Sequence, residues 1–245
     1  MTKTAFITGV TAGIGQAAAR RFVADGWTVI GTGRRADRLD LLKQELGERF
    51  RGLELDMRET ASFDRLPDEV GAVDLLVNNA GLAPPMSGLQ DADQGPIDTV
   101  IDTNISGLVA LTRVLLPGLI ERKGAVINLS SVAATYPYKG GAVYAGSKAF
   151  VRQFSLGLRC DLVGTGVRVT SIEPGMVETE FTIVRNGGDQ AASDELYAGV
   201  DPMTAEDIAD TIFYVATLPP HLNINALELM PVRQSWAGFA VDREA

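Results

Sequence analysis

The sequence predicts one α/β domain in which a doubly wound, seven-stranded parallel sheet is covered by helices on both faces. The first observation behind this prediction is that short apolar segments alternate along the chain with amphipathic helical segments, as in βαβ units. The second is the length, because 245 residues without a break in composition fit a single domain over residues 1–245. The third is the composition, since 46% hydrophobic and 22% charged residues are typical of a globular protein and exclude a disordered one.

The first strand and the first helix show the alternation most clearly. Residues 4–8 form a short apolar run, which predicts a buried strand. A helix follows with Ile14, Ala18 and Phe22 at four-residue spacing on one face, and Gly26 marks its end. Further strands are predicted from apolar runs at 27–32, 53–55, 73–78, 125–130, 167–172 and 227–230.

Helices are predicted between and after these strands. A long helical pattern runs from about residue 96 to residue 122, and we expect Pro117 to kink it. Thr204 begins a helix in which Asp207 is a candidate partner for a capping box. The least regular segment, 180–202, is expected to be a loop that acts as a lid over the site. The other helices are predicted at 39–46 and 142–162.

Charge and the scarcity of two residue types exclude several classes of function. The net charge of −9 repels phosphate backbones, so we expect no nucleic-acid partner. Cys160 is the one cysteine, which excludes an intrachain disulfide and favours a reducing, cytoplasmic location. The one histidine, His221, cannot build a histidine-rich metal site, so we expect no metal and a surface position for it. We also expect no signal peptide and no membrane span, because no apolar run reaches about 18 residues.

A glycine-rich turn directly follows the first predicted strand. Residues 8–15 read Thr-Gly-Val-Thr-Ala-Gly-Ile-Gly, and such glycines allow a tight turn and close approach of the backbone to a pyrophosphate. The helix that follows offers free N–H groups and the positive end of its dipole. The spacing differs from the more common G-x-G-x-x-G, and an ordinary glycine turn is the alternative. The residues expected to hold a dinucleotide here are Gly9, Thr11, Ala12, Gly13, Ile14 and Gly15.

The end of the second strand indicates which dinucleotide the site prefers. NAD-selective sites place an acidic residue there to bind the ribose 2′-hydroxyl. This chain has Arg34 and Arg35 instead, with Arg38 one turn further on, and guanidinium groups suit a phosphate. We therefore predict NADP(H) rather than NAD, the alternative being that these arginines are ordinary solvated charges. Asp56 and Met57 follow the third strand, where they would meet the adenine, although Asp56 would serve equally well as a helix N-cap.

A tyrosine and a lysine four residues apart predict acid–base chemistry. Tyr144 and Lys148 lie one turn apart on the same face of a predicted helix. A nearby ammonium favours the phenolate, so we expect Lys148 to lower the pKa of Tyr144 from about 10. Ser131 is placed just past the fifth strand to hold a substrate oxygen, and Ser130 competes for that role. Asn104 would interrupt the long helix and trap a water, or else would be an exposed polar residue.

In this order and at these spacings, the residues resemble the short-chain dehydrogenase/reductase family over essentially the whole chain. The resemblance implies a single-domain Rossmann fold and hydride transfer between NADP(H) and a carbonyl/alcohol pair. It also implies a homotetramer or a homodimer. The motifs that carry it are the turn at 8–15, Asn78-Asn79-Ala80-Gly81, Asn104, Ser131, Tyr144, Lys148 and Pro174-Gly175.

The resemblance also implies roles for individual residues. Tyr144 would donate a proton in reduction and accept one in oxidation, and Lys148 would bind the nicotinamide ribose and tune Tyr144. Ser131 would orient and polarise the carbonyl, and Asn104 would hold a water that links Lys148 to solvent. Thr179 would meet the nicotinamide carboxamide. The other cofactor-binding residues that the family implies are Asn79, Ala80, Gly81, Pro174, Gly175 and Val177.

A closer resemblance is to the bacterial NADP-dependent 3-hydroxy acid dehydrogenases, also called serine 3-dehydrogenases. Members of this group oxidise short hydroxy acids such as serine, allo-threonine and 3-hydroxypropionate, and they reduce the matching semialdehydes. The substrate carboxylate needs a cation, and Arg185 in the expected lid is the candidate, with a mobile surface charge as the alternative. The resemblance rests on Thr32-Gly33-Arg34-Arg35, Tyr136-Pro137-Tyr138, residues 149–156, Val184-Arg185, Asn223-Ile224-Asn225 and Met230-Pro231-Val232.

Other functions are open on the sequence alone. Relatives of this group reduce sulfoacetaldehyde, and Arg185 would hold a sulfonate as well as a carboxylate. A broad aldehyde or ketone reductase with a neutral pocket is another alternative within the family. A protein that senses NADP(H) without catalysis is the alternative from a different class. Retention of Ser131, Tyr144, Lys148 and Asn104 together argues against a sensor.

Overall fold

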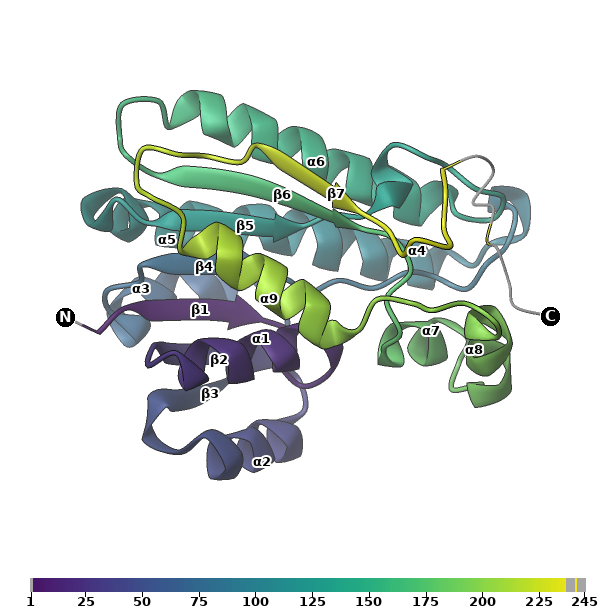
Figure 1. Cartoon of the computed structure of the whole chain (residues 1–245), viewed down its shortest axis with the longest axis horizontal. Helices are drawn as coiled ribbons and strands as arrows, with labels where there is room; N and C mark the ends of the chain where they lie inside the picture. Colours follow the sequence, from purple (N-terminus) through teal and green to yellow (C-terminus); the bar gives the residue numbers. More distant parts are fainter. Residues whose placement is uncertain (1, 237–240, 242–245) are drawn as a thin grey trace.

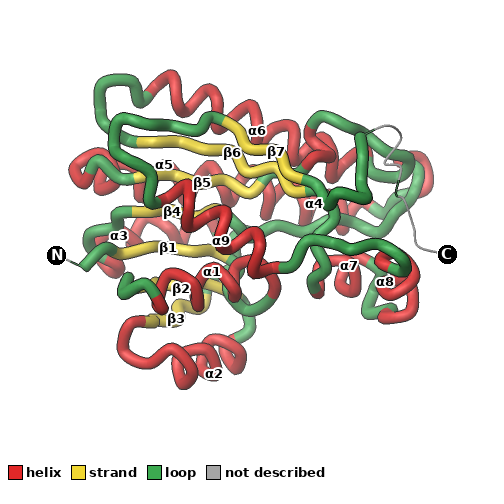
Figure 2. The backbone as a smooth tube through the Cα atoms, in the orientation of Figure 1, coloured by secondary structure: helices red, strands yellow, loops and turns green. Residues whose placement is uncertain are grey.

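The computed structural model describes residues 2–236 and residue 241, in which one parallel sheet lies between two layers of helices (Figure 1, Figure 2). The strands are β1 Thr4–Thr8, β2 Thr28–Gly33, β3 Phe50–Glu54, β4 Leu75–Asn78, β5 Ala125–Leu129, β6 Arg168–Pro174 and β7 Ala226–Leu229. The helices are α1 Gly13–Ala24, α2 Ala36–Leu46, α3 Leu66–Val70, α4 Gln94–Ile101, α5 Leu108–Arg122, α6 Ala142–Asp161, α7 Glu180–Arg185, α8 Gln190–Tyr197 and α9 Ala205–Ala216.

The order of the strands confirms the predicted doubly wound sheet. In the described part of the chain, seven strands run parallel in the order β3-β2-β1-β4-β5-β6-β7. The chain adds β2 and β3 on one side of β1 and then returns to add β4 on the other side. The order therefore reverses between β1 and β4, and ligands of such sheets bind at this point, beyond the carboxyl ends of the strands.

Two separate apolar cores cover the two faces of the sheet. Successive side chains of a strand point to opposite faces, so neighbours in sequence enter different cores. Ile7 packs in one core with Phe22 of α1 and Ile212 of α9. Phe6 packs in the other core, which includes Leu111 of α5. Helices on both faces explain why the strands read as nearly continuous apolar runs.

The predicted strands agree with the observed ones to within two residues at each end, except for β3. This strand was expected at 53–55 and lies at Phe50–Glu54. It forms the edge of the sheet, and only Phe50 in it is fully buried, so it has no continuous apolar run. The five-residue helix α3, which lies between β3 and β4, was not predicted.

The long predicted helix is observed as a continuous helical segment of 29 residues from Gln94 to Arg122. It consists of α4, a π-helical segment at Asp102–Gly107 and α5, which runs on through Pro117. By length and composition it is the one helix among the described residues that could cross a membrane, with a mean hydropathy of 1.4. Leu111 and Leu119 of this helix are buried against the sheet, as in the core helix of a globular domain.

The segment 180–202 is not the irregular loop that the sequence led us to expect. It contains α7 and α8, which lie on the side of the sheet where the strands end (Figure 1). Thr179 accepts a hydrogen bond from the Phe181 N–H and Asp189 accepts one from the Ala192 N–H, so both helices have a side-chain N-cap. The expectation of irregular structure is therefore wrong, because helices of six and eight residues are too short to show a clear apolar period. A lid role for this segment stays a prediction.

Helix α9 begins with the predicted capping box. The Asp207 N–H donates a hydrogen bond to Thr204 Oγ1 at 3.2 Å, and the Thr204 N–H donates one to the Asp207 carboxylate at 2.7 Å. Both N–H groups would otherwise lack a partner at the start of the helix. Because α9 brings Ile208 and Ile212 into one core, this cap supports the sheet as well as the helix.

We expect Thr204→Ala to lower the free energy of unfolding by about 1 kcal/mol, because one cap bond is lost at a helix that packs on the core. Urea unfolding followed by circular dichroism measures this loss. Thr204→Ser keeps the hydroxyl and should stay close to the parent. Equal midpoints for the alanine variant and the parent would contradict the role assigned to the cap.

Candidate active site

The predicted site residues meet at the carboxyl edge of the sheet, beside the reversal of strand order. The glycine turn follows β1, residues 79–81 follow β4, Ser131 follows β5 and Pro174 ends β6. Helix α6 carries Tyr144 and Lys148 to the same edge. Segments that are far apart in the sequence thus converge because the strands are parallel and end together.

The glycine turn has the geometry needed to hold a dinucleotide. Gly9 and Gly13 have φ values of 72° and 52°, a conformation that favours glycine. A Cβ atom on Gly15 would collide with the carbonyl oxygen of Gly9, and Thr179 lies directly against Gly13. Ala12 provides no side-chain cap, so the first N–H groups of the 12-residue helix α1 are left for another acceptor. This turn fits a pyrophosphate.

The residues after β4 connect the glycine turn to the catalytic side chains. Thr8 Oγ1 accepts hydrogen bonds from the N–H groups of Asn79 at 3.0 Å and of Ala80 at 2.8 Å. The Asn79 side chain donates in return to the Thr8 carbonyl at 2.8 Å. A Cβ on Gly81 would lie 3.2 Å from Nζ of Lys148, so glycine lets the backbone approach the ammonium.

Lys148 is buried beside Tyr144 on one face of α6. Its Nζ lies 5.8 Å from the centroid of the Tyr144 ring. The side chain is 6% exposed, and Nζ donates a hydrogen bond to the Leu129 carbonyl at 2.7 Å. Burial lowers the pKa of Lys148 to about 8, because the charged ammonium loses hydration.

The expectation that Lys148 lowers the pKa of Tyr144 is wrong for this structure. Burial raises the pKa of the Tyr144 phenol to about 12. A hydrogen bond with Ser131 lowers this pKa, Tyr138 raises it and the charge of Arg185 lowers it, but burial has the largest effect. The ammonium of Lys148 binds the carbonyl at the end of β5 instead of the phenol. The phenol is therefore protonated at neutral pH and suited to donate a proton.

The two candidate serines have different hydrogen-bond partners. Ser130 Oγ donates a hydrogen bond to the Lys148 carbonyl at 2.7 Å, so this hydroxyl is committed to the backbone of α6. The Ser131 hydroxyl accepts a hydrogen bond from the Ala133 N–H at 3.2 Å and donates one to the Pro174 carbonyl at 3.4 Å, and it lowers the pKa of the nearby Tyr144 phenol. Ser131 is therefore the serine beside the Tyr144 phenol, and its role in holding a substrate oxygen stays a prediction.

Asn104 lies inside the π-helical segment, which confirms that the helical hydrogen bonds are interrupted there. It is 1% exposed, so the alternative of an exposed polar residue is wrong. Its Oδ1 accepts a hydrogen bond from the Leu82 N–H at 3.0 Å. Its Nδ2 donates to the Leu82 carbonyl at 2.9 Å and to Ser147 Oγ at 3.0 Å. These bonds tie the long helix to α6, and the predicted role of Asn104 in holding a water stays a prediction.

Arg185 ends α7 and places a positive charge close to Tyr144. Its guanidinium carbon lies 5.8 Å from the centroid of the Tyr144 ring and 5.4 Å from that of Tyr138. Its Nε donates a hydrogen bond to the Pro84 carbonyl at 3.3 Å. Its Nη2 is buried and has no hydrogen-bond partner among the described residues. The side chain is partly buried, which argues against a fully exposed charge, and its binding of an anionic group stays a prediction.

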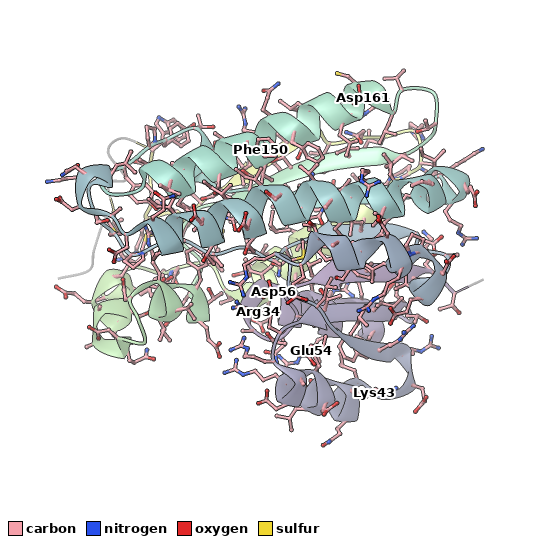
Figure 3. All side chains as sticks on the ribbon, turned by 180° about the vertical axis from the view of Figure 1, so that it is seen from behind. Arg34, Lys43, Glu54, Asp56, Phe150 and Asp161 are labelled. Atoms are coloured by element: carbon pink, nitrogen blue, oxygen red, sulfur yellow. The ribbon has the colours of Figure 1, made fainter. Side chains whose placement is uncertain are left out.

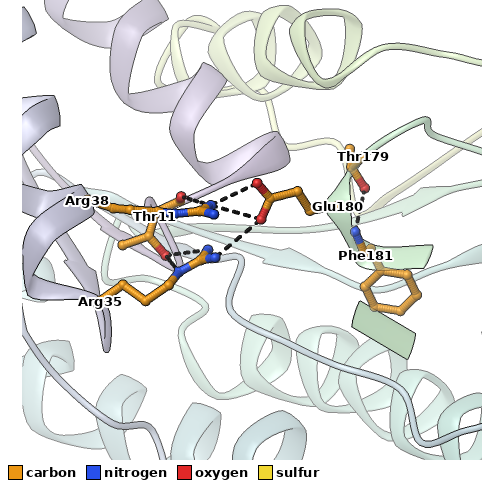
Figure 4. A network of polar contacts seen from close by, with 6 residues as sticks. All are labelled: Thr11, Arg35, Arg38, Thr179, Glu180 and Phe181. Carbon is orange, nitrogen blue, oxygen red and sulfur yellow. Dashed lines mark hydrogen bonds and ion pairs between the residues drawn. The ribbon is translucent and has the colours of Figure 1, made fainter. Parts of the chain in front are cut away.

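Arg35 and Arg38 share one polar cluster (Figure 4), and the contact of Arg34 with a 2′-phosphate stays a prediction. Arg35 donates to Thr11 Oγ1 from Nε at 3.1 Å and from Nη2 at 2.9 Å. Arg38 Nη1 donates to the Thr11 carbonyl at 3.2 Å. Both guanidinium groups also pair with the carboxylate of Glu180. The cluster places two positive charges beside the glycine turn, where they suit a phosphate.

Arg34 lies apart from this cluster and lines a surface pocket with Glu54 and Asp56 (Figure 3). The Asp56 carboxylate accepts hydrogen bonds from the Arg58 guanidinium at 2.6 Å and from the Arg58 N–H at 3.0 Å. The Arg58 guanidinium holds the pKa of Asp56 below its usual range. The side chain of Met57 belongs to the apolar core. Contact of Asp56 and Met57 with an adenine stays a prediction.

Three side chains near the site were not predicted individually. Phe181 lies with its ring centroid 5.6 Å from that of Tyr144, and Tyr138 lies under Arg185. Glu180 joins Arg35 and Arg38 across 145 and 142 residues of sequence. The signal available for Glu180 was its position directly after Thr179, which was expected to meet the cofactor.

The described residues contain no group of three or more His, Cys, Asp or Glu side chains that could hold a metal ion. His221 is exposed, which confirms its predicted surface position. The groups assembled at the carboxyl edge of the sheet are instead a phenol, a hydroxyl, an ammonium and guanidinium groups.

Comparison with known proteins identifies relatives of this chain. The sequence matches the family described as short chain dehydrogenase over residues 3–189. It is 61% identical to a serine 3-dehydrogenase of Rhizobium radiobacter and 53% identical to a sulfoacetaldehyde reductase of Chromohalobacter salexigens, in each case over 100% of both chains. A solved structure described as the closed form of serine dehydrogenase complexed with NADP⁺ has a TM-score of 0.93 and 48% identity, and covers 98% of this chain and 100% of its own. The chain therefore belongs to the short-chain dehydrogenase family.

Proposed function

We propose that this protein is an NADP(H)-dependent dehydrogenase of short 3-hydroxy acids, such as serine, allo-threonine and 3-hydroxypropionate, and of the matching semialdehydes. The observation that carries the proposal is the buried, unpaired Nη2 of Arg185 close to Tyr144. A substrate carboxylate would pair this nitrogen through a charge-assisted hydrogen bond, whereas a neutral substrate would leave it unpaired. The relatives named as serine dehydrogenases support the same class of substrate.

NADP(H) is the cofactor that fits the residues at the glycine turn, and when bound it would exchange a hydride with the substrate carbon. The uncapped start of α1 fits its pyrophosphate. Arg35 and Arg38 fit its 2′-phosphate, because guanidinium groups bind phosphate by forked hydrogen bonds. Gly33 ends β2, and no carboxylate is present at that position to select NAD. The related structure described as complexed with NADP⁺ supports this cofactor.

Tyr144 is the proposed acid and base. Its phenol would give a proton to the carbonyl oxygen in reduction, and the phenolate would take the hydroxyl proton in oxidation. Ser131, which lies beside the phenol, would donate a hydrogen bond to the same substrate oxygen and hold it at the proton. Lys148 would bind the nicotinamide ribose and, with a pKa of about 8, would exchange its proton near neutral pH.

A sulfoacetaldehyde reductase is the second candidate, because a relative with that name is 53% identical over the full chain. A sulfonate would bind Arg185 in the same way as a carboxylate. A broad reductase of neutral aldehydes and ketones is disfavoured, since it would leave the Arg185 nitrogen buried and unpaired. A sensor without catalysis is disfavoured because Ser131, Tyr144 and Lys148 are assembled in one site.

Substrate charge should decide how much Arg185 matters. We expect Arg185→Ala to raise KM about 10- to 100-fold for serine, 3-hydroxypropionate and 2-hydroxyethanesulfonate, because a charge-assisted bond is lost. KM for a neutral secondary alcohol should stay within about twofold, and Arg185→Lys should be intermediate for the anions. Initial rates with NADP measure these effects. Equal changes for anionic and neutral substrates would contradict the proposal, and the substrate with the highest kcat/KM separates hydroxy acids from sulfonates.

The charge of Arg185 should also set the pH dependence of oxidation. Arg185 lowers the pKa of Tyr144 against the larger, opposite effect of burial. Arg185→Met removes the charge and raises that pKa, so the rise of kcat with pH should move to higher pH. Oxidation of a neutral secondary alcohol at saturating NADP, between about pH 7 and pH 10, isolates this effect from substrate binding. An unshifted profile would argue against this effect of Arg185.

The variant Tyr144→Phe should bind NADPH but have almost no turnover.

We propose further that the protein is a cytoplasmic homotetramer, with the helices that carry Asn104 and Tyr144 at one interface. Ile101 and Phe150 support this, because they expose 40% and 37% of their surface on α4 and α6 (Figure 3 labels Phe150). The unpaired cysteine Cys160 fits a reducing compartment.

Sedimentation velocity should give about four times the chain mass of 26.1 kDa. Phe150→Glu should lower the mass to that of a dimer, because a charge would enter the helical interface. The control Gln44→Glu, at an exposed polar position on α2, should leave the tetramer intact. A monomer of the parent chain would contradict the tetramer.

A further inference from the structure

The carboxylate of Glu180 links α7 to the arginines beside the glycine turn. Glu180, the first residue of α7, lies between the guanidinium groups of Arg35 and Arg38 (Figure 4). Its two oxygens accept hydrogen bonds from Arg38 Nη1 at 2.8 and 2.9 Å, and Oε2 accepts one from Arg35 Nη1 at 3.2 Å. These two arginines also hold Thr11 of the glycine turn. Three separate segments of the chain therefore meet at the Glu180 carboxylate.

Glu180 is an anion at neutral pH. Burial alone would raise its pKa, but hydrogen bonds from Arg38 and Arg35 and the charges of these residues lower the pKa below its usual range. The carboxylate thus lies on the same two guanidinium groups that are proposed to bind the 2′-phosphate of the cofactor. Carboxylate and phosphate use the same forked hydrogen bonds to arginine, and their like charges repel each other.

The other end of the same helix reaches the substrate site. Helix α7 has six residues and is too short to be stable without tertiary contacts. Phe181 packs against the Tyr144 ring at 5.6 Å, and the Thr182 and Tyr197 hydroxyls are 2.8 Å apart. Arg185 ends the helix over Tyr144. The position at which Glu180 holds α7 therefore sets the position of Arg185.

We propose that Glu180 is a positioning residue that couples the 2′-phosphate site to the substrate site. Its carboxylate holds α7 so that Arg185 meets the substrate anion. Its negative charge also weakens the binding of the 2′-phosphate to Arg35 and Arg38. Coupling between two binding sites is reciprocal, so each site responds to the other through Glu180. The inference rests on the proposed function, since it takes Arg185 as the anchor of the substrate anion.

The cofactor half of the coupling is tested by binding alone. Titration calorimetry compares adenosine 2′,5′-bisphosphate with 5′-AMP on the parent and on Glu180→Gln, which keeps the size of the side chain and removes its charge. We expect Glu180→Gln to bind the 2′,5′-bisphosphate about three- to tenfold more tightly and 5′-AMP equally well. Glu178→Gln removes an exposed charge two residues earlier and should change neither affinity. No change in Glu180→Gln, or the same change in Glu178→Gln, would overturn the proposal.

The substrate half is tested by kinetics at saturating NADP. Glu180→Gln should raise KM for 3-hydroxypropionate about three- to tenfold and leave KM for a neutral secondary alcohol within about twofold. In an Arg185→Ala background the same substitution should change neither KM, because the group that Glu180 positions is absent. If Arg185→Ala discriminates between acid and neutral substrates but Glu180→Gln does not, the coupling fails. If Arg185→Ala does not discriminate, the proposed function fails, and the calorimetry still decides whether Glu180 opposes the 2′-phosphate.

Discussion

The candidate active site is organised around one buried ammonium group. Lys148 is 6% exposed, and its Nζ is held by the Leu129 carbonyl at 2.7 Å. Gly81 leaves room for the ammonium and for the Asn104 side chain, and the Ser130 hydroxyl donates a hydrogen bond to the Lys148 carbonyl. A buried charge is strongly destabilising unless polar groups surround it. The end of β5, the π-helical segment and the loop after β4 are therefore arranged about one side chain, and Tyr144 takes its place one turn away on α6.

Most of the fold could be predicted from the sequence because strands buried on both faces appear as apolar runs. The run at 4–8 coincides with β1 at Thr4–Thr8. Strand β3 lies at the edge of the sheet and has a neighbouring strand on one side only. Only Phe50 in it is fully buried, so its apolar pattern is weak. The helices α7 and α8 could not be predicted, because their stability depends on two N-caps and on tertiary contacts and not on a repeated apolar period.

The site residues also divide into those that local sequence could predict and those that it could not. Ser131, Tyr144 and Lys148 could be predicted because local spacing and the ends of parallel strands already place them together. The pairing of Glu180 with Arg38 could not, since it joins positions 142 residues apart. The pKa of Tyr144 depends on burial, which no local pattern reveals. The net charge of −9 was equally uninformative about Arg35 and Arg38, because close contacts outweigh a distant, screened field.

The π-helical segment at Asp102–Gly107 lets the long helix hold an extra residue. A π turn contains an extra residue, and each residue rotates an α-helix by about 100°. The apolar stripes of α4 and α5 are therefore out of phase in a regular helical count. The wider π turn absorbs the extra residue, so Leu111 and Leu119 still face the sheet. Deleting one residue here would restore a regular helix with the same apolar face, and it would remove the widened turn that contains Asn104. The extra residue therefore serves the site and not the core.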